Sequence, residues 1–190
     1  MEGERPGVLV LLGSPRKHGN SAALAQRIAE GAEEAGARVE TVVLNDLKIA
    51  PCRSCYRCQR PEAKGCAQDD DMQPLYHRLI ACPAWVIASP VYWFTMSAQT
   101  KLWMDRCFAL GAYAKDPFRG KKIAIAMSYG GEDPFSSGCV NALRTFQDAF
   151  NYTGSKIVGM VYGAAMKPGE IETNSGLMEE ARELGRALVR

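Results

Sequence analysis

The chain of 190 residues is poor in histidine and has no long hydrophobic run. Its two histidines, His18 and His77, have no readable Ser or Cys partner, and no Gly-x-Ser-x-Gly motif is present, which argues against hydrolysis by a catalytic triad. No apolar stretch approaches the ~20 residues that span a bilayer, and the first residues show no signal-peptide pattern. Because 23 Lys and Arg nearly balance 21 Asp and Glu, nothing favours nucleic acid or a membrane as a partner, and we expect a cytoplasmic protein.

Short apolar runs alternate along the chain with segments of helical periodicity. This alternation predicts an α/β fold with a five-stranded parallel sheet and helices on both faces. We expect residues 1–190 to form one domain, because no linker, repeat or low-complexity tract is visible. The expected strands cover residues 7–12, 38–44, 84–88, 122–127 and 155–162, and the expected helices cover residues 19–36, 71–82, 98–110, 137–152 and 175–189.

Three loops of unusual composition follow the first, third and fourth of these strands, at the sheet edge where ligands of open α/β folds bind. The first loop, residues 13–21, joins a strand to a helix N-terminus and predicts a phosphate site, because free backbone N–H groups and the helix dipole attract anions there. Its candidate binding residues are Ser14, Arg16, Asn20 and Ser21. The simpler alternative is a turn in which Asn20 or Ser21 only caps the helix. The motifs of P-loop and dinucleotide-binding proteins are absent from the sequence.

The second and third loops suit a planar ligand. The aromatic residues of loop 89–97 are adjacent and cannot all face one core, so some remain free to contact a flat ring, unless they form a subunit interface instead. The candidate binding residues of this loop are Pro90, Val91, Tyr92 and Trp93. Those of the third loop, whose glycines alone would indicate only a turn, are Ser128, Gly130 and Gly131. Together the loops predict a site for a ligand with a terminal phosphate and a planar ring, which FMN fits.

Four of the seven cysteines lie in an irregular insertion over residues 48–70. Cys52, Cys55 and Cys58 follow one another with two-residue gaps, and Cys66 comes after seven more residues. Thiolates at this spacing can hold a [4Fe-4S] cluster, with the fourth reached across a short loop. They would also accept zinc, and free thiols or a redox-active disulfide without metal stay open as well. The remaining cysteines, interpreted as buried free thiols, are Cys82, Cys107 and Cys139.

These segments resemble the flavodoxin-like NADPH-dependent FMN reductases and, within them, the iron–sulfur flavoproteins. The resemblance runs from about residue 7 to residue 163 and is most specific in the cysteine segment. It is carried by Gly13-Ser14-Pro15-Arg16 with Asn20-Ser21, Ala50-Pro51-Cys52 through Asp69-Asp70-Asp71-Met72, Ser89-Pro90-Val91-Tyr92, Ala98-Gln99-x-Lys101 with Asp105-Arg106, and Gly130-Gly131. It implies a flavodoxin-like three-layer α/β/α sandwich with strand order 2-1-3-4-5 and FMN at the carboxyl edge of the sheet, in a homodimer or homotetramer.

The resemblance also implies an FMN-dependent NAD(P)H oxidoreductase that passes electrons from a nicotinamide through flavin N5 to a quinone, a flavin or another small-molecule acceptor. The flavin would carry the chemistry, so no side chain is expected to act as a catalytic acid or base. The alternative is an iron–sulfur flavoprotein, an electron carrier with FMN, a [4Fe-4S] cluster on the four clustered cysteines and a ferredoxin-type partner. A zinc-binding module without catalysis is a third interpretation. Lys101, Asp105 and Arg106 match family positions, and we expect them to form ion pairs on a helix surface.

Overall fold

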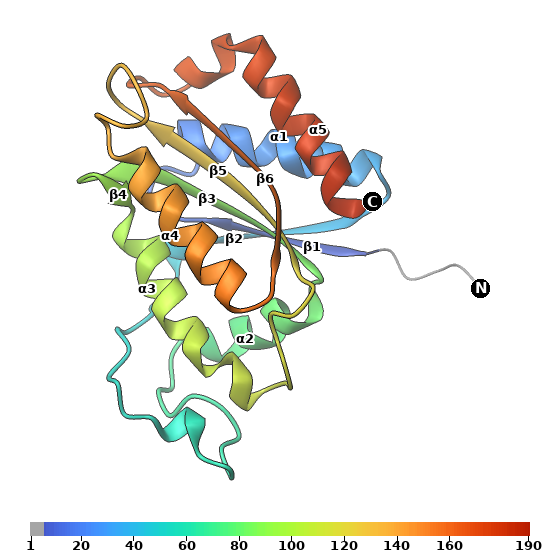
Figure 1. Ribbon diagram of the computed structural model, residues 1–190, viewed down its shortest axis with the longest axis vertical. Coiled ribbons are helices and arrows are strands. Elements are labelled where there is room, and N and C mark those ends of the chain that lie inside the picture. The colour runs from blue at the N-terminus through green and yellow to red at the C-terminus, as the bar shows by residue number, and fades with distance from the viewer. Residues whose placement is uncertain (1–5) are drawn as a thin grey trace.

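A sheet of five parallel strands runs through the middle of the molecule in the computed structural model, which describes residues 6–190 (Figure 1). These strands are β1 (Gly7–Leu12), β2 (Arg38–Val43), β3 (Ala84–Tyr92), β5 (Lys122–Tyr129) and β6 (Lys156–Ala164). Their spatial order is β2-β1-β3-β5-β6, and all neighbours in it are parallel. Counting the parallel strands alone, this is the predicted flavodoxin-like order 2-1-3-4-5, so the fold prediction is confirmed. The expectation that the chain begins without a signal peptide concerns residues 1–5, which lie outside the described part of the chain.

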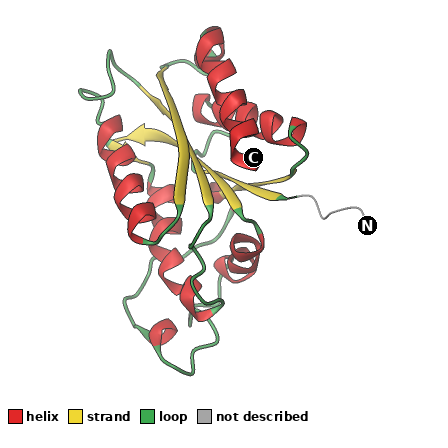
Figure 2. Ribbon diagram, turned by 45° about the vertical axis from the view of Figure 1, so that its right-hand side comes forward, coloured by secondary structure: helices red, strands yellow, loops and turns green. Residues whose placement is uncertain are grey.

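Helices cover both faces of the sheet (Figure 2). They are α1 (Asn20–Glu34), α2 (Met72–Ala81), α3 (Ala98–Arg106), α4 (Cys139–Tyr152) and α5 (Ser175–Val189). Helices α1 and α5 pack on one face with one apolar core, and α2, α3 and α4 pack on the other face with a second core (Figure 1). Because both faces are buried, the central strands are continuous apolar runs rather than alternating ones. α3 ends earlier than expected, and the chain continues in a 3₁₀ turn, η3 (Cys107–Ala112).

The contact between α1 and α5 is close because two glycines leave room for the partner backbone. A Cβ atom added to Gly31 would overlap the carbonyl oxygen of Arg182, and one added to Gly185 would overlap that of Ile28. Glu34 of α1 also pairs with two arginines of α5, Arg182 and Arg186. This packing holds α1 firmly on the sheet, with its N-terminus beside the carboxyl end of β1.

Strand β3 is longer than the sequence indicated, and this corrects the expected loop 89–97. Residues 89 and 90 continue the pairing with β5, and a two-residue turn then leads to a short antiparallel strand, β4 (Thr95–Met96). The backbone polar groups of Ala88 face β1, because its carbonyl oxygen accepts the N–H of Gly13. The backbone nitrogen of Pro90, two residues later, faces the same side, but β1 has already ended there, so proline is tolerated. The missing N–H of proline therefore costs the sheet no hydrogen bond.

The cysteine segment lies apart from the strand ends. Between η1 (Leu44–Asp46) and α2 the chain forms one short 3₁₀ turn, η2 (Arg57–Gln59), and is otherwise irregular. It lies at the bottom of Figure 1, next to the C-terminal end of α3, whereas β5 and β6 end at the top. Within residues 6–190, no helix combines the length and the apolar character needed to cross a membrane.

Candidate functional site

The carboxyl ends of β1, β3 and β5 surround a cavity of about 260 Å³, which we call the strand-end pocket. It brings together most of the predicted binding residues from all three loops and adds residues that follow β6. Its lining consists of Ser14, Arg16, Gly19, Asn20, Ser21, Pro90, Val91, Tyr92, Ser128, Tyr129, Gly130, Ala165, Met166 and Pro168. Two predicted residues, Trp93 and Gly131, are not part of this lining in the described chain.

The first loop presents an uncapped helix N-terminus to the strand-end pocket. Helix α1 begins after Gly19, and no side chain among residues 6–190 accepts a hydrogen bond from its first N–H groups. This excludes the simpler alternative in which Asn20 or Ser21 caps the helix. The buried Oγ of Ser14 accepts the N–H of Arg16 at 3.0 Å, which shapes the loop around the pocket. The free N–H groups and the helix dipole make this end of α1 attractive to an anion.

Arg16 is the cation of this loop. Its guanidinium pairs with no carboxylate in the described part of the chain, whereas the neighbouring Lys17 forms an ion pair with Asp46 at 2.6 Å. Arg16 lines the strand-end pocket and Lys17 does not. The pocket therefore has one uncompensated positive charge beside the free end of α1, and its guanidinium can bind a phosphate with two parallel hydrogen bonds.

Asn20 lines the strand-end pocket and also binds a distant part of the chain. Its Nδ2 donates to the carbonyl oxygen of Lys167 at 2.9 Å, and its Oδ1 accepts the N–H of Ile171 at 3.3 Å. The amide thus ties the start of α1 to the segment between β6 and the 3₁₀ turn η4 (Glu170–Thr173). The Asn20 amide therefore lines the pocket while both its nitrogen and its oxygen are hydrogen-bonded to backbone groups.

The segment that Asn20 binds forms a fourth wall of the pocket, which the sequence analysis did not predict. Ala165, Met166 and Pro168 follow β6 and line the pocket. The Met166 side chain lies directly over Gly130, where an added Cβ atom would overlap its sulfur. Residues 165–168 contain no recognisable motif, and the only available signal was their place after the last strand of the sheet.

The second loop holds an aromatic hairpin at the rim of the pocket. Trp93 and Phe94 form the turn between β3 and β4, with φ of 50° and 65°, as a type I′ turn requires. Asn141 of α4 donates to the carbonyl oxygen of Phe94 at 3.0 Å, and Gly138 leaves space for the Phe94 backbone. Trp93 is 91% exposed and extends into solvent, so Tyr92 is the aromatic residue that reaches the pocket.

The N-terminus of α3 is joined to the first loop. Ser97 Oγ caps α3 by accepting the N–H of Thr100, and it donates to the carbonyl oxygen of Gly13 at 2.6 Å. Thr100 packs so closely on Gly13 that an added Cβ atom would overlap its Oγ1. These residues are buried, and they fix the first loop and α3 as one rigid unit.

A second cavity, of about 410 Å³, lies at the other end of α3, and we call it the cysteine cavity. All four clustered cysteines line it: Cys52, Cys55, Cys58 and Cys66. Cys52 and Cys55 are exposed, the other two are half-buried, and all four are free thiols. As they stand, no three Cys, His, Asp or Glu side chains of residues 6–190 converge closely enough to hold a metal ion. The other cysteines, Cys82, Cys107 and Cys139, are buried as expected.

Arg106 corrects the expectation of a surface ion pair. Lys101 and Asp105 do pair on the exposed face of α3, at 2.6 Å. The side chain of Arg106 is instead 1% exposed and pairs with Asp70 at 2.5 and 3.0 Å. Burial raises the pKa of Asp70, but hydrogen bonds from Arg106 and from the N–H groups of Ala50 and Met72 more than offset this, so the pKa lies below its ordinary value and the carboxylate stays ionised.

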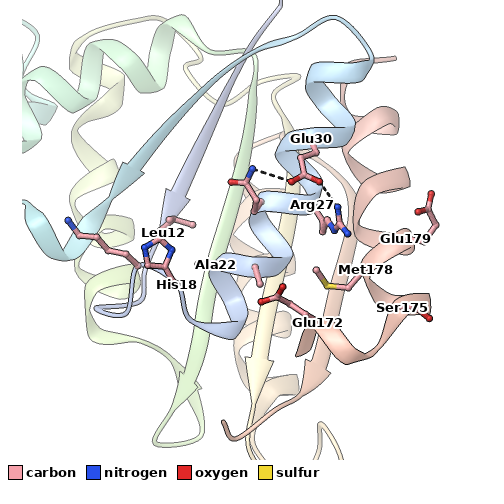
Figure 3. Close-up of a pocket in the computed structure, with 12 residues that line it drawn as sticks. Leu12, His18, Ala22, Arg27, Glu30, Glu172, Ser175, Met178 and Glu179 are labelled. Carbon is pink, nitrogen blue, oxygen red and sulfur yellow. Dashed lines mark hydrogen bonds and ion pairs between the residues drawn. The ribbon is translucent and has the colours of Figure 1, made fainter. Parts of the chain in front are cut away.

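A larger cavity, of about 800 Å³, runs beside α1 and the start of α5 (Figure 3). Among its charged side chains, Arg27 pairs with Glu30 at 2.7 Å. Lys17, which also lines it, pairs with Asp46. The lysine and the arginine that line this groove are therefore both paired with carboxylates, unlike Arg16 of the strand-end pocket.

Comparison with known proteins identifies the family of this chain. A sequence profile of NADPH-dependent FMN reductases matches residues 6–167. The chain belongs to the NADPH-dependent FMN reductase family. It is therefore an NAD(P)H-dependent flavin oxidoreductase, as the family resemblance of its sequence implied.

Several relatives of this FMN reductase family member are named iron-sulfur flavoproteins. This chain is 31% identical over 147 residues to the iron-sulfur flavoprotein of Methanosarcina thermophila, and the match covers 77% of this chain and 74% of that protein. It is 30% identical over 179 residues to an iron-sulfur flavoprotein of Archaeoglobus fulgidus, covering 92% and 75%. The fold matches that of the NAD(P)H:quinone oxidoreductase from Methanothermobacter marburgensis with a TM-score of 0.75, at 21% identity and 98% coverage of both chains.

Proposed function

We propose that the strand-end pocket binds FMN with its phosphate at the N-terminus of α1 and its ring between the ends of β3 and β5. One observation carries the proposal: the free first turn of α1 and the unpaired Arg16 face the same cavity. A phosphate would satisfy both at once. Side-chain hydroxyls of Ser14 and Ser21 lie in the same wall and would add donors to the phosphate oxygens.

The ring end of the pocket has backbone groups and little charge. Pro90, Val91 and Tyr92 form one side, and Ser128, Tyr129 and Gly130 form the other. Bound FMN would supply two-electron redox chemistry, and backbone N–H groups at these strand ends would orient its ring and stabilise added negative charge. Since the described pocket contains neither histidine nor carboxylate, we assign no side chain to acid or base catalysis.

We infer that NAD(P)H is the electron donor and that the acceptor is a quinone, a flavin or another small aromatic molecule. Tyr92 is 42% exposed at the rim, and the neighbouring Phe94 is 55% exposed. Such rings can stack on a flat substrate that approaches the open side of the pocket. Family membership supports the donor, and the aromatic rim supports the chemical class of the acceptor.

Calorimetric titration with FMN tests the proposal directly, with riboflavin as the matched ligand that lacks only the phosphate. We expect FMN to bind with heat release and riboflavin to bind far more weakly. Anaerobic addition of NADPH to the FMN-loaded protein should then bleach the flavin absorption bands, and a quinone should restore them. Absence of any heat with FMN would refute the binding site, and an unbleached spectrum would refute the donor.

A second function is favoured by the cysteine cavity: an iron–sulfur flavoprotein that carries electrons between FMN, a [4Fe-4S] cluster and a ferredoxin-type partner. The donor set is chemically suitable, because four thiols line one cavity and thiolates are the ligands of such clusters. Within residues 6–190, the buried Nε of Arg106 and Oε1 of Gln68 have no hydrogen-bond partner, and both residues line this cavity. A thiolate-bound cluster would offer acceptors to these buried groups in addition to the Asp70 carboxylate that already pairs with Arg106, and zinc on the same thiols is the competing occupant.

Anaerobic reconstitution with ferrous iron and sulfide distinguishes these occupants. A [4Fe-4S] cluster predicts four irons and four acid-labile sulfides per chain and a broad brown absorption. Protein that retains one zinc and takes up no sulfide would refute the cluster and leave the flavin reductase intact. The expected homodimer or homotetramer remains a prediction, and sedimentation of the FMN-loaded protein would check it.

A further inference from the structure

The cysteine segment is held in place by one side chain from α3. The guanidinium of Arg106 reaches both ends of the segment, because Nη1 donates to the carbonyl oxygen of Ala50 at 2.7 Å and both terminal nitrogens bind Asp70. Nη2 also donates to Sγ of Cys66 at 3.4 Å. A single planar group therefore joins the start of the segment, its end and one of its four thiols.

This arrangement is built into the protein rather than placed on its surface. Arg106 is 2% exposed as a residue, and its own carbonyl oxygen accepts a hydrogen bond from the buried hydroxyl of Tyr76 at 3.0 Å. Asp70 accepts the N–H groups of Ala50 and Met72, both at 3.1 Å, so backbone groups hold the carboxylate in place independently of its contact with the guanidinium. Removing one partner of such a buried pair would leave an uncompensated charge.

The pair also leaves donors directed at the cysteines. The ion pair itself is neutral overall, because one guanidinium meets one carboxylate. Arg106 nevertheless donates to a thiol sulfur, and its Nε beside the same cavity finds no hydrogen-bond partner among residues 6–190. Hydrogen bonds to sulfur and nearby net charge are two of the factors that set the reduction potential of an iron–sulfur cluster.

We propose that Arg106 is a positioning residue that fastens the cysteine segment and stabilises the added electron of a cluster bound there, with Asp70 limiting this effect by cancelling its charge. The second part rests on the [4Fe-4S] cluster proposed above. The first part concerns the chain alone. The two parts therefore have separate tests.

The fastening is tested by hydrogen exchange on FMN-loaded protein without iron. The variant is the double substitution Arg106→Gln with Asp70→Asn, which removes the pair without leaving a buried charge. We expect amides of residues 50–70 to exchange at least roughly tenfold faster, as loss of the bonds that close the segment requires. Arg53→Gln, which lines the same cavity from an exposed position, is the control and should leave exchange unchanged. Unchanged exchange in the double variant would overturn the fastening.

The electrostatic part is tested by the midpoint potential of the reconstituted cluster in two single variants. Arg106→Gln should lower the potential, because a donor and a positive charge are lost. Asp70→Asn should raise it, because the guanidinium loses its counter-charge. General loosening of the segment would move both variants in the same direction, and that result, or no shift, would overturn this part. If the wild-type protein takes up no iron and sulfide, the cluster proposal fails, and the exchange experiment still decides the fastening.

Discussion

The strand-end pocket and the cysteine cavity lie at the two ends of α3 and are constructed in opposite ways. The pocket is made by regular elements, since strand ends, the first turn of α1 and a hairpin supply its walls. The cysteine cavity is made by an irregular segment that depends on a few side-chain bonds to Arg106, Tyr113 and Gln73. The difference shows that the strand-end pocket follows from the fold itself, whereas the cysteine cavity is formed by an insertion that side chains of the fold hold in place.

Their separation follows from the helix between them. The nine residues of α3 span about 13 Å at the rise of an α-helix, with the joint to Gly13 at one end and Arg106 at the other. Electrons exchanged between the two sites of one chain would have to cross this distance. Three substitutions should each disturb one of the two sites and spare the other, and a fourth should touch neither.

Gly13→Ala should have the largest effect and should damage the strand-end pocket. The new methyl group would overlap Thr100 Oγ1 and press on the carbonyl oxygen of Ala88. We expect a loss of about 3 kcal/mol in the free energy of unfolding, measured by urea denaturation, and weaker FMN binding. Gly111→Ala is the control, because an added Cβ atom there has nothing within 4 Å. Equal stability of the two variants would show that the joint between Gly13 and α3 is not tight.

Arg16→Ala should act on FMN binding alone. Loss of a charge-assisted phosphate contact predicts affinity weaker by roughly 1.5–3 kcal/mol, measured by calorimetry, with thermal stability of the free protein almost unchanged. Lys17→Ala removes the adjacent positive charge, which is paired with Asp46 away from the pocket, and should change the affinity much less. If the two variants bind FMN equally, general electrostatic attraction rather than a direct contact holds the phosphate.

Tyr113→Phe should loosen the cysteine cavity and spare the flavin site. The hydroxyl of Tyr113 accepts the N–H of Cys66 at 3.1 Å and donates to Gln73 Oε1 at 2.7 Å. Its removal should cost about 1–2 kcal/mol and speed alkylation of Cys66, measured by mass spectrometry of the labelled peptides. The affinity for FMN should stay the same. A matching loss of FMN affinity would mean that the two ends of α3 are coupled more tightly than their contacts indicate.

Glu34→Gln should have the smallest effect and should touch neither site. Hydrogen bonds from Arg182 and Arg186 lower the pKa of Glu34 to about 2, so its stabilising contribution is full above the ordinary value of about 4.3 and is lost as pH falls towards 2. The stability difference from wild type should therefore be constant near neutral pH and vanish in acid, as urea denaturation at each pH would show. Glu33→Gln is the matched control, because no ion pair within residues 6–190 involves Glu33, and it should leave the stability at neutral pH unchanged. A difference that persists at pH 2 would refute the ion pair as its cause.

Local sequence patterns predicted the parallel sheet and three walls of the pocket, because each depends on a strand and the loop directly after it, whereas the strand order was implied by the family resemblance. The same reasoning missed what long-range contacts decide. Met166 lies at the pocket beside a segment that Asn20 binds from the start of α1, and the buried Arg106 meets Asp70, 36 residues earlier in the chain. Strand β4 was missed because a turn formed by Trp93 and Phe94 carries none of the Asn-Gly chemistry that marks such hairpins.

The turn formed by Trp93 and Phe94 lowers the stability of the folded protein, and interactions elsewhere in the molecule must offset this loss. Bulky residues with positive φ are each destabilised by roughly 1–3 kcal/mol, and an Asn-Gly pair in their place would relax the backbone and raise the melting temperature. The indole gains nothing from burial in return, since Trp93 is 91% exposed. The chain thus stores conformational energy beside the strand-end pocket, and replacing the two residues by Asn-Gly would recover that energy at the loss of two exposed aromatic rings.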